Sequence, residues 1–314
     1  MELKNDTNKR LLKSLRDIQS WACGGMEPRI AEINDFTDGN GRIEAASIQM
    51  FLEGMQNIGS GLQQVGHIFS IEPQKNLAVG NLKLLTANAL TILALKDTLK
   101  TGIDDLDCLT QIMMCGLATG QLGLIKPFHH AVFTGLNGGY GVGDGHNLPI
   151  GTTLRYAAFG LTIIGDWLGK PLDLDKHALP RDPAWGQLVA HWREPDPEKL
   201  LPILLDACDT HVERIALNSR EVDSGNFEFG SPFEAVYPAE ILAIKNLRHS
   251  LGLETPFIDH PLMKSPYAML TLPPNTPLDH DELLEQFLKA ACRYNPEAVP
   301  EGLYEAVRET GAIG

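Results

Sequence analysis

The stretch LKLLTANALTILAL, from Leu82 to Leu95, decides the fold class of this 314-residue chain. Its apolar residues occur on nearly every side of a helix, and Lys83 is its only charged residue. A helix that is apolar almost all round is typical of the centre of a protein core. The segment therefore predicts a buried helix against which amphipathic helices pack.

Helical spacing of apolar residues continues along the rest of the chain. The first such stripe is formed by Leu11, Leu12, Leu15 and Ile18. Further helices are predicted over residues 46–55, 104–118, 152–167, 197–215, 239–251, 279–292 and 301–309. Alternating apolar and polar runs are rare, and the best strand candidate is the short segment 268–272. We therefore expect an all-α protein, a compact bundle-like array of about ten helices with little or no β-structure.

The composition excludes a disordered, a collagen-like or a disulfide-rich chain. Hydrophobic residues make up 43% and charged residues 21% of the chain, which is ordinary for a globular protein. The five cysteines are scattered and form no C-x-x-C pair, which is typical of reduced thiols in a cytosolic protein. The first 16 residues are charged and lack the apolar run of a signal peptide. We therefore expect a cytoplasmic protein. We also expect no membrane partner, because the uncharged stretch 108–125 contains too many glycines and glutamines for a membrane span.

A glycine-rich segment, GLNGGYGVGDGHNLPIG at residues 135–151, holds seven glycines. Its glycine spacing fits neither a dinucleotide-binding loop nor a phosphate-binding loop. We interpret it as a connecting loop between an N-terminal helical region, 1–134, and a C-terminal acidic helical region, 152–314. The two regions are expected to pack as one unit.

Histidines and a carboxylate near this loop define the alternative function. Imidazole and carboxylate groups suit zinc or iron, so His129, His130, Asp144 and His146 are candidate metal ligands of a metal-dependent all-helical enzyme. Adjacent histidines on a helix point about 100° apart, so that His129 and His130 do not face one metal together. No motif spacing places two ligands on one helical face, and we expect no catalytic residue, metal or cofactor.

Negative charge is concentrated in the second half of the chain. The net charge is −14, and the segment from Glu194 to Glu240 holds 11 acidic and 3 basic residues. A nucleic-acid partner needs a basic footprint, so direct nucleic-acid binding is excluded. Six carboxylates are candidate partner-binding residues: Asp206, Asp209 and Glu213 on one helical face, and Glu221, Asp223 and Glu228 in the loop that follows, within reach of the same surface. Such a face either keeps the protein soluble or docks on a basic protein.

The segment FEAVYPAEILAIKNLR at residues 233–248, followed by Gly252 and by FIDHPL at 257–262, resembles a known family. It is similar to the C-terminal helical region of bacterial immunity proteins that neutralise polymorphic-toxin or type VI secretion effectors (the PoNi-like family). The matching positions are Phe233, Glu234, Ala235, Glu240, His260 and Pro261. The resemblance implies an all-helical, cytoplasmic, non-catalytic protein. Its function would be to occlude the active site or assembly of a cognate toxin, typically a basic nuclease. A helical adaptor with another partner is a further alternative.

Overall fold

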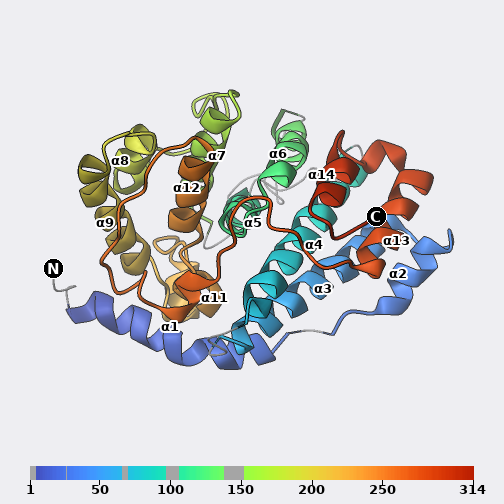
Figure 1. The fold of residues 1–314 in the computed structure, drawn as a ribbon, viewed down its shortest axis with the longest axis horizontal. Helices are drawn as coiled ribbons and strands as arrows, with labels where there is room; N and C mark the ends of the chain where they lie inside the picture. The colour runs from blue at the N-terminus through green and yellow to red at the C-terminus, as the bar shows by residue number, and fades with distance from the viewer. Residues whose placement is uncertain (1–4, 26, 66–69, 97–105, 138–151) are drawn as a thin grey trace. The chain divides into compact units, whose positions relative to one another are not determined.

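A computed structural model describes residues 5–25, 27–65, 70–96, 106–137 and 152–314 of the chain (Figure 1). Over these residues the protein is all-α, as predicted, with fourteen α-helices. The β-structure found in these residues is an isolated bridge between Ile215 and Phe229. The helices are α1 (Asn5–Cys23), α2 (Ile30–Thr37), α3 (Ile43–Gln63), α4 (Glu72–Leu95), α5 (Leu106–Ala118), α6 (Leu122–Asn137), α7 (Arg155–Trp167), α8 (Pro183–His191), α9 (Pro197–Glu213), α10 (Ser219–Asp223), α11 (Pro232–Val236), α12 (Ala239–Ser250), α13 (Glu282–Tyr294) and α14 (Leu303–Glu309).

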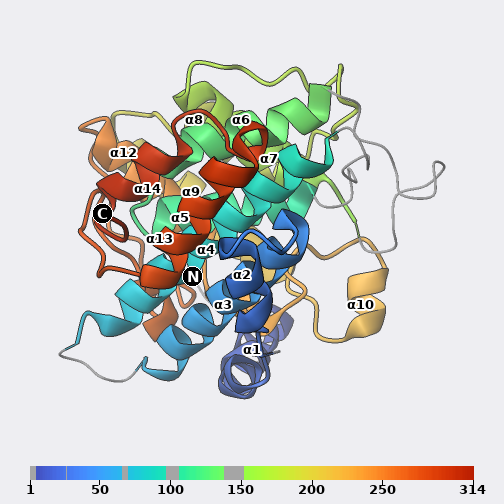
Figure 2. The same cartoon turned by 90° about the vertical axis from the view of Figure 1, so that its right-hand side faces the viewer.

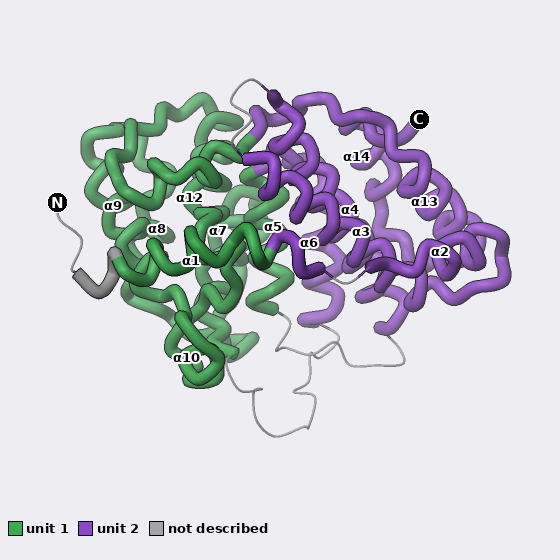
Figure 3. The backbone as a smooth tube through the Cα atoms, turned by 90° about the horizontal axis from the view of Figure 1, so that it is seen from below, with its two compact units in different colours: residues 1–21, 106–118, 147–271 green, residues 22–105, 119–146, 272–314 purple. Residues whose placement is uncertain are grey.

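The helices group into two compact units that are interleaved along the chain (Figure 3). Unit 1 comprises residues 1–21, 106–118 and 147–271, and unit 2 comprises residues 22–105, 119–146 and 272–314. We expected consecutive regions, 1–134 and 152–314, on either side of the glycine-rich segment. Each unit instead draws segments from both of those regions. Residues 138–151 of the glycine-rich segment lie outside the described residues, and residues 135–137 form the end of α6.

Unit 2 is built around α3 and α4, which run side by side (Figures 1 and 2). Their backbones approach closely where glycine faces glycine. A Cβ atom added to Gly54 would lie 2.8 Å from the carbonyl oxygen of Gly80, and one added to Gly80 would lie 2.6 Å from the carbonyl oxygen of Gly54. Glycine at these two positions therefore permits the contact between the helices.

The predicted central helix is the C-terminal part of α4. Leu82, Leu85 and Leu90 are fully buried, which confirms that the segment lies in a core. Helix α4 is long and apolar enough to cross a membrane. However, 78% of its most apolar 18-residue segment is buried inside the structure, as in the core helix of a globular protein. Lys83 is also buried, and its Nζ lies 2.7 Å from Oδ2 of Asp281, the N-cap residue of α13.

Unit 1 is organised by α5, which packs against α7 and α12. The side chain of Asn246 on α12 donates hydrogen bonds to the carbonyl oxygens of Leu117 and Ala118 at the end of α5, over 2.8 and 3.1 Å. Asp107, in the first turn of α5, accepts hydrogen bonds from the backbone nitrogens of Leu154 and Ala157, both over 2.8 Å. It thereby binds amides at the start of α7 that have no partner within that helix.

Residues 268–272 do not form the strand that the sequence favoured. Pro266–Met269 is a 3₁₀-helix, and the side chain of Ser265 accepts a hydrogen bond from the backbone nitrogen of Ala268. Serine followed by proline is a helix-start signal, and here it prevails over a short alternating pattern.

Candidate functional site

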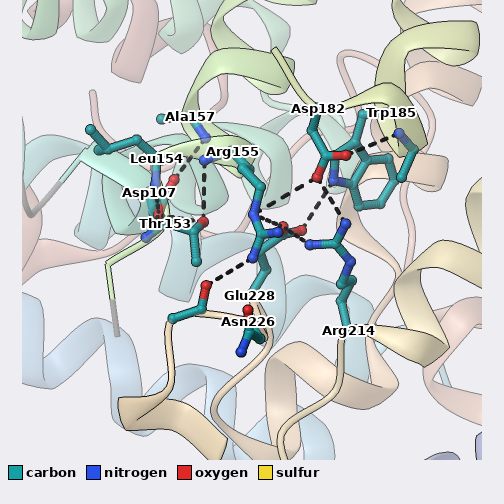
Figure 4. A network of polar contacts seen from close by, with 12 residues as sticks. Asp107, Thr153, Leu154, Arg155, Ala157, Asp182, Trp185, Arg214, Asn226 and Glu228 are labelled. Atoms are coloured by element: carbon teal, nitrogen blue, oxygen red, sulfur yellow. Dashed lines mark hydrogen bonds and ion pairs between the residues drawn. The ribbon is translucent and has the colours of Figure 1, made fainter. Parts of the chain in front are cut away.

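Four charged side chains meet in unit 1 where α7, α8 and α9 come together (Figure 4). Arg155 is the first residue of α7, Asp182 the N-cap of α8 and Arg214 the C-cap of α9, while Glu228 lies before α11. Oε1 of Glu228 lies 3.1 Å from Nε of Arg155 and 3.0 Å from Nη1 of Arg214. Nη2 of Arg214 lies 2.9 Å from Oδ2 of Asp182. We call these four residues the charged network.

Neighbouring groups hold each member of the charged network in place. Oδ1 of Asp182 accepts a hydrogen bond from the backbone nitrogen of Ala184 over 3.0 Å and so caps α8. Nη2 of Arg155 donates to the carbonyl oxygen of Gly225 over 2.9 Å, and Nε1 of Trp185 donates to Oε2 of Glu228 over 3.0 Å. The loop before α11 is thus tied to both α7 and α8.

The charged network is electrically balanced, with two guanidinium groups and two carboxylates. The side chain of Glu228 is only 1% exposed. Burial raises the pKa of Glu228, and the pull of Arg214, the hydrogen bond from Trp185 and the pull of Arg155 act against this shift. A buried charge is tolerated when it is paired, but removing one partner leaves the other uncompensated. The geometry therefore fixes the ends of three helices relative to one another.

A cavity of about 240 Å³ adjoins the charged network, between α7 and α8. Arg155 and Asp182 form part of its wall, together with the stacked rings of Phe159 and Trp185, whose centroids lie 4.6 Å apart. The other lining residues are Ala158, Thr162, Leu174, Pro180, Arg181, Gly186 and Val189.

A second polar cluster, formed by His211, Glu240 and Tyr156, is buried beside the charged network. Nδ1 of His211 lies 2.7 Å from Oε1 of Glu240, and Nε2 lies 3.1 Å from the carbonyl oxygen of Ala235. A carbonyl oxygen only accepts, so the contact with Ala235 is made by Nε2 as a donor, while Nδ1 faces the carboxylate. The hydroxyl of Tyr156 donates to Oε2 of Glu240 over 3.4 Å, and burial raises the pKa of this tyrosine. The cluster joins α7, α9 and α12, and Glu240 is among the positions that carry the family resemblance.

The three carboxylates predicted to share a face do so on α9. Asp206 and Glu213 are exposed. Asp209 is half-buried, and its Oδ1 lies 3.2 Å from Nε2 of His260. The helical spacing placed these residues correctly because it depends only on local geometry.

The other three predicted carboxylates lie in different surroundings. Glu221 and Asp223 belong to the short helix α10; Asp223 is exposed, whereas Glu221 forms an ion pair of 2.6 Å with Arg10. Glu228 is the buried centre of the charged network. It is not part of an exposed acidic surface, contrary to the sequence prediction, because Arg155, Trp185 and Arg214 enclose it.

The candidate metal ligands are only partly within the described residues. His129 and His130 are consecutive on α6: His129 is buried and stacks on Phe133 with a centroid distance of 4.0 Å, and His130 is exposed. Asp144 and His146 lie outside the described residues. In the part of the chain that the structure describes, no three histidine, cysteine, aspartate or glutamate side chains are arranged to hold a metal ion.

Three members of the charged network and Trp185 were not identified from the sequence. The Asp182-Pro183 pair is a helix-start signal that could have revealed α8 and its N-cap. Arg155 and Arg214 carry no comparable signal, since their importance arises from partners distant in the sequence.

Comparison of the chain with protein-family models, with curated proteins and with solved structures finds no match. The contacts, burial and charges of the chain's own residues therefore carry the functional interpretation.

Proposed function

We propose that this chain is a non-catalytic, cytoplasmic binding protein: an immunity protein that neutralises a cognate antibacterial toxin with a basic, nuclease-type active site. The observation that carries the proposal is the row of carboxylates on α9, together with an exposed phenylalanine on the segment whose His260 contacts Asp209. We call this surface, defined by Asp206, Asp209, Glu213 and Phe257, the acidic face.

Two of the three carboxylates of the acidic face, Asp206 and Glu213, are exposed to solvent. Within the described residues, neither Asp206 nor Glu213 forms an ion pair. Like charges spaced three and four residues apart on a helix repel one another, so the arrangement costs stability. A field of one sign steers a partner of the opposite sign and accelerates association.

Phe257 supplies the apolar part of the acidic face. It is 82% exposed, the largest exposed fraction among the described large hydrophobic side chains. It lies three residues before His260, which contacts Asp209 on α9. Aromatic residues are enriched at the centres of protein interfaces, and charged groups at their rims. A phenylalanine near carboxylates therefore has the composition expected of a docking surface.

Buried contacts hold α9 in position behind this surface. His211 on α9 is bound to Glu240 of α12, and Arg214 at its C-terminus is bound to Glu228 and Asp182. A surface that is already ordered loses less conformational entropy when it binds. Carboxylates on such a rigid helix would occupy a basic groove where a nuclease otherwise holds phosphates, and nuclease inhibition would follow from occlusion.

The experiment begins with recovery of the partner. The purified chain is used as bait in a lysate of the source organism, and a stoichiometric basic partner is identified by mass spectrometry. The partner is then purified, and its toxin activity is measured with and without the chain. Stoichiometric inhibition supports the proposal; a recovered partner that has no toxin activity, or whose activity is unchanged by the chain, contradicts it.

Variants test the acidic face itself. Asp206→Lys combined with Glu213→Lys is expected to slow association about tenfold at low salt, because steering depends on the field of exposed charges. Phe257→Ala is expected to accelerate dissociation instead. Glu297→Lys combined with Glu301→Lys, which makes the same change of charge at exposed positions of unit 2, is the matched control. Equal association rates for both double variants would exclude the acidic face as the binding surface.

A further inference from the structure

The cavity between α7 and α8 is lined mainly by apolar side chains, whereas the acidic face consists mainly of carboxylates. We propose that this cavity binds a small, uncharged aromatic molecule, a function additional to the binding of a protein partner. Four features of the cavity lead to this assignment: its apolar lining, its paired charges, its size and a glycine at its edge.

Most of the cavity wall is apolar. Phe159 and Trp185 stack with an interplanar angle of 21°, and Leu174, Pro180 and Val189 complete the apolar lining. Aromatic rings favour offset or edge contacts with other rings, at centroid distances of about 4.5–7 Å. Ligand pockets are typically lined by such side chains with a few polar groups that orient the ligand.

The charged groups of the wall are already paired with neighbouring residues. Both oxygens of Asp182 are engaged, one by the backbone nitrogen of Ala184 and the other by Arg214. At the surface, Nη1 of Arg181 lies 2.6 Å from Oδ1 of Asp175. A charged ligand would bring a charge without a counter-charge into a partly dry site, which is unfavourable. An uncharged ligand avoids this cost.

Arg155 provides one hydrogen-bond donor for a ligand. Its Nε faces Glu228 and its Nη2 donates to the carbonyl oxygen of Gly225. Its Nη1 makes no hydrogen bond within the described part of the chain, so that it could donate to one acceptor atom on a ligand.

The volume of about 240 Å³ restricts the ligand to a small molecule. Pockets for drug-sized ligands range from about 300 to 1,000 Å³. One ring, or two fused rings, therefore fits the available space better than a nucleotide or a peptide.

Gly186 in α8 lies at the exposed edge of the cavity. A Cβ atom added there would meet nothing within 4 Å, so neither a close helix contact nor a backbone constraint requires glycine. A helix with glycine in its interior is less stable than one with alanine, because glycine loses more conformational freedom when the chain folds. Gly186 therefore leaves open space at the exposed edge of the cavity, although alanine would stabilise the helix.

Nuclear magnetic resonance of the ¹⁵N-labelled full chain tests the proposal with indole as the probe. The reporter is the side-chain N–H of Trp185, which lines the cavity and donates to Glu228, and its resonance is assigned with a Trp185→Phe variant. Indole is expected to shift this resonance in a saturable way. Benzoate, a charged aromatic molecule of similar size, is expected to bind at least about tenfold more weakly.

Gly186→Leu is expected to weaken indole binding at least about tenfold, because a large side chain at the edge of the cavity reduces the space for a ligand, and a Cβ atom there meets nothing within 4 Å. Ala190→Leu, which adds the same apolar group at an exposed position of α8, is the matched control and should bind as the wild type does. The spectrum of each variant verifies its fold, and Val189→Phe replaces Gly186→Leu if the latter fails to fold. No saturable shift in the wild type, equal binding by a folded cavity-filling variant, or benzoate binding as tight as that of indole would overturn the proposal.

Discussion

The two units hold their helices together by different means. In unit 2, α3 and α4 approach through Gly54 and Gly80, with no room for a Cβ atom at either position. In unit 1, helix ends are joined by buried charges, above all the pairing of Glu228 with Arg155 and Arg214. The first arrangement depends on the absence of side-chain atoms, and the second depends on the presence of every charged partner.

This difference has a practical consequence for experiments. All four tryptophans of the chain (Trp21, Trp167, Trp185 and Trp192) belong to unit 1. Tryptophan fluorescence therefore reports unfolding of unit 1, whereas far-ultraviolet circular dichroism reports the helices of both units. A change that affects one unit more than the other is detected by comparing the two transitions.

The largest effect is expected from Glu228→Ala in unit 1. This change leaves two arginine side chains without their shared partner, and breaking a buried ion pair typically costs about 3–5 kcal/mol. Urea unfolding followed by tryptophan fluorescence measures the loss. Asp175→Asn, which breaks the exposed pair with Arg181, is the control and should cost less than about 1 kcal/mol. Similar losses for the two variants would show that the charged network does not hold unit 1 together.

Glu240→Ala tests the second polar cluster of the same unit. The change removes the partner of His211 and Tyr156, and each buried polar group left without a hydrogen bond costs about 1–3 kcal/mol. We expect a total loss of about 2–4 kcal/mol in the free energy of unfolding, again measured by fluorescence. Glu254→Ala, at an exposed position, should be nearly neutral. A normal melting curve for Glu240→Ala would contradict a structural role for this carboxylate.

Gly80→Ala tests the close helix contact of unit 2. The added methyl group would lie 2.6 Å from both the carbonyl oxygen of Gly54 and Cγ1 of Ile58, and overpacking of this kind costs about 1–3 kcal/mol. The loss should be seen by circular dichroism. Gly123→Ala in α6, where the nearest atom lies 3.9 Å away, should instead be neutral or stabilising by up to about 1 kcal/mol. Stabilisation by Gly80→Ala would mean that the two helices have room to separate.

Local patterns explain how much of the fold was predictable. The apolar segment 82–95 and the carboxylates of α9 were placed correctly, because helical periodicity relates residues only a few positions apart. Helix α8 was missed, because it is short and contains Gly186. The strand expected at 268–272 was wrong, because a proline and a capping serine directly before it favour a 3₁₀-helix.

The candidate site was less predictable for a physical reason. Glu228 was assigned to an exposed acidic surface because the charge density of its own segment is high. Its partner Trp185 lies 43 positions away, and the partner of Glu221, Arg10, lies 211 positions away. No periodic pattern links residues at such separations, so the division of the six carboxylates into exposed, half-buried and buried groups depends on the tertiary fold.

The smallest effect on stability is expected when an ion-paired carboxylate is replaced by an amide, and each unit offers one such carboxylate. The hydrogen bond from Arg10 holds the pKa of Glu221 below its ordinary value of 4.5, and the hydrogen bond from Lys289 lowers that of Glu285 in unit 2. Because the unfolded chain binds more protons than the folded chain in this range, each pair stabilises the fold fully above about pH 4.5 and less as the pH falls through the lowered pKa. Glu221→Gln should therefore be less stable than the wild type at pH 7, by up to about 1 kcal/mol, and equally stable at the lowest pH. Fluorescence should detect this convergence for Glu221→Gln, and circular dichroism should detect the corresponding convergence for Glu285→Gln. A difference from the wild type that stays constant down to acidic pH would assign the loss to packing instead of charge.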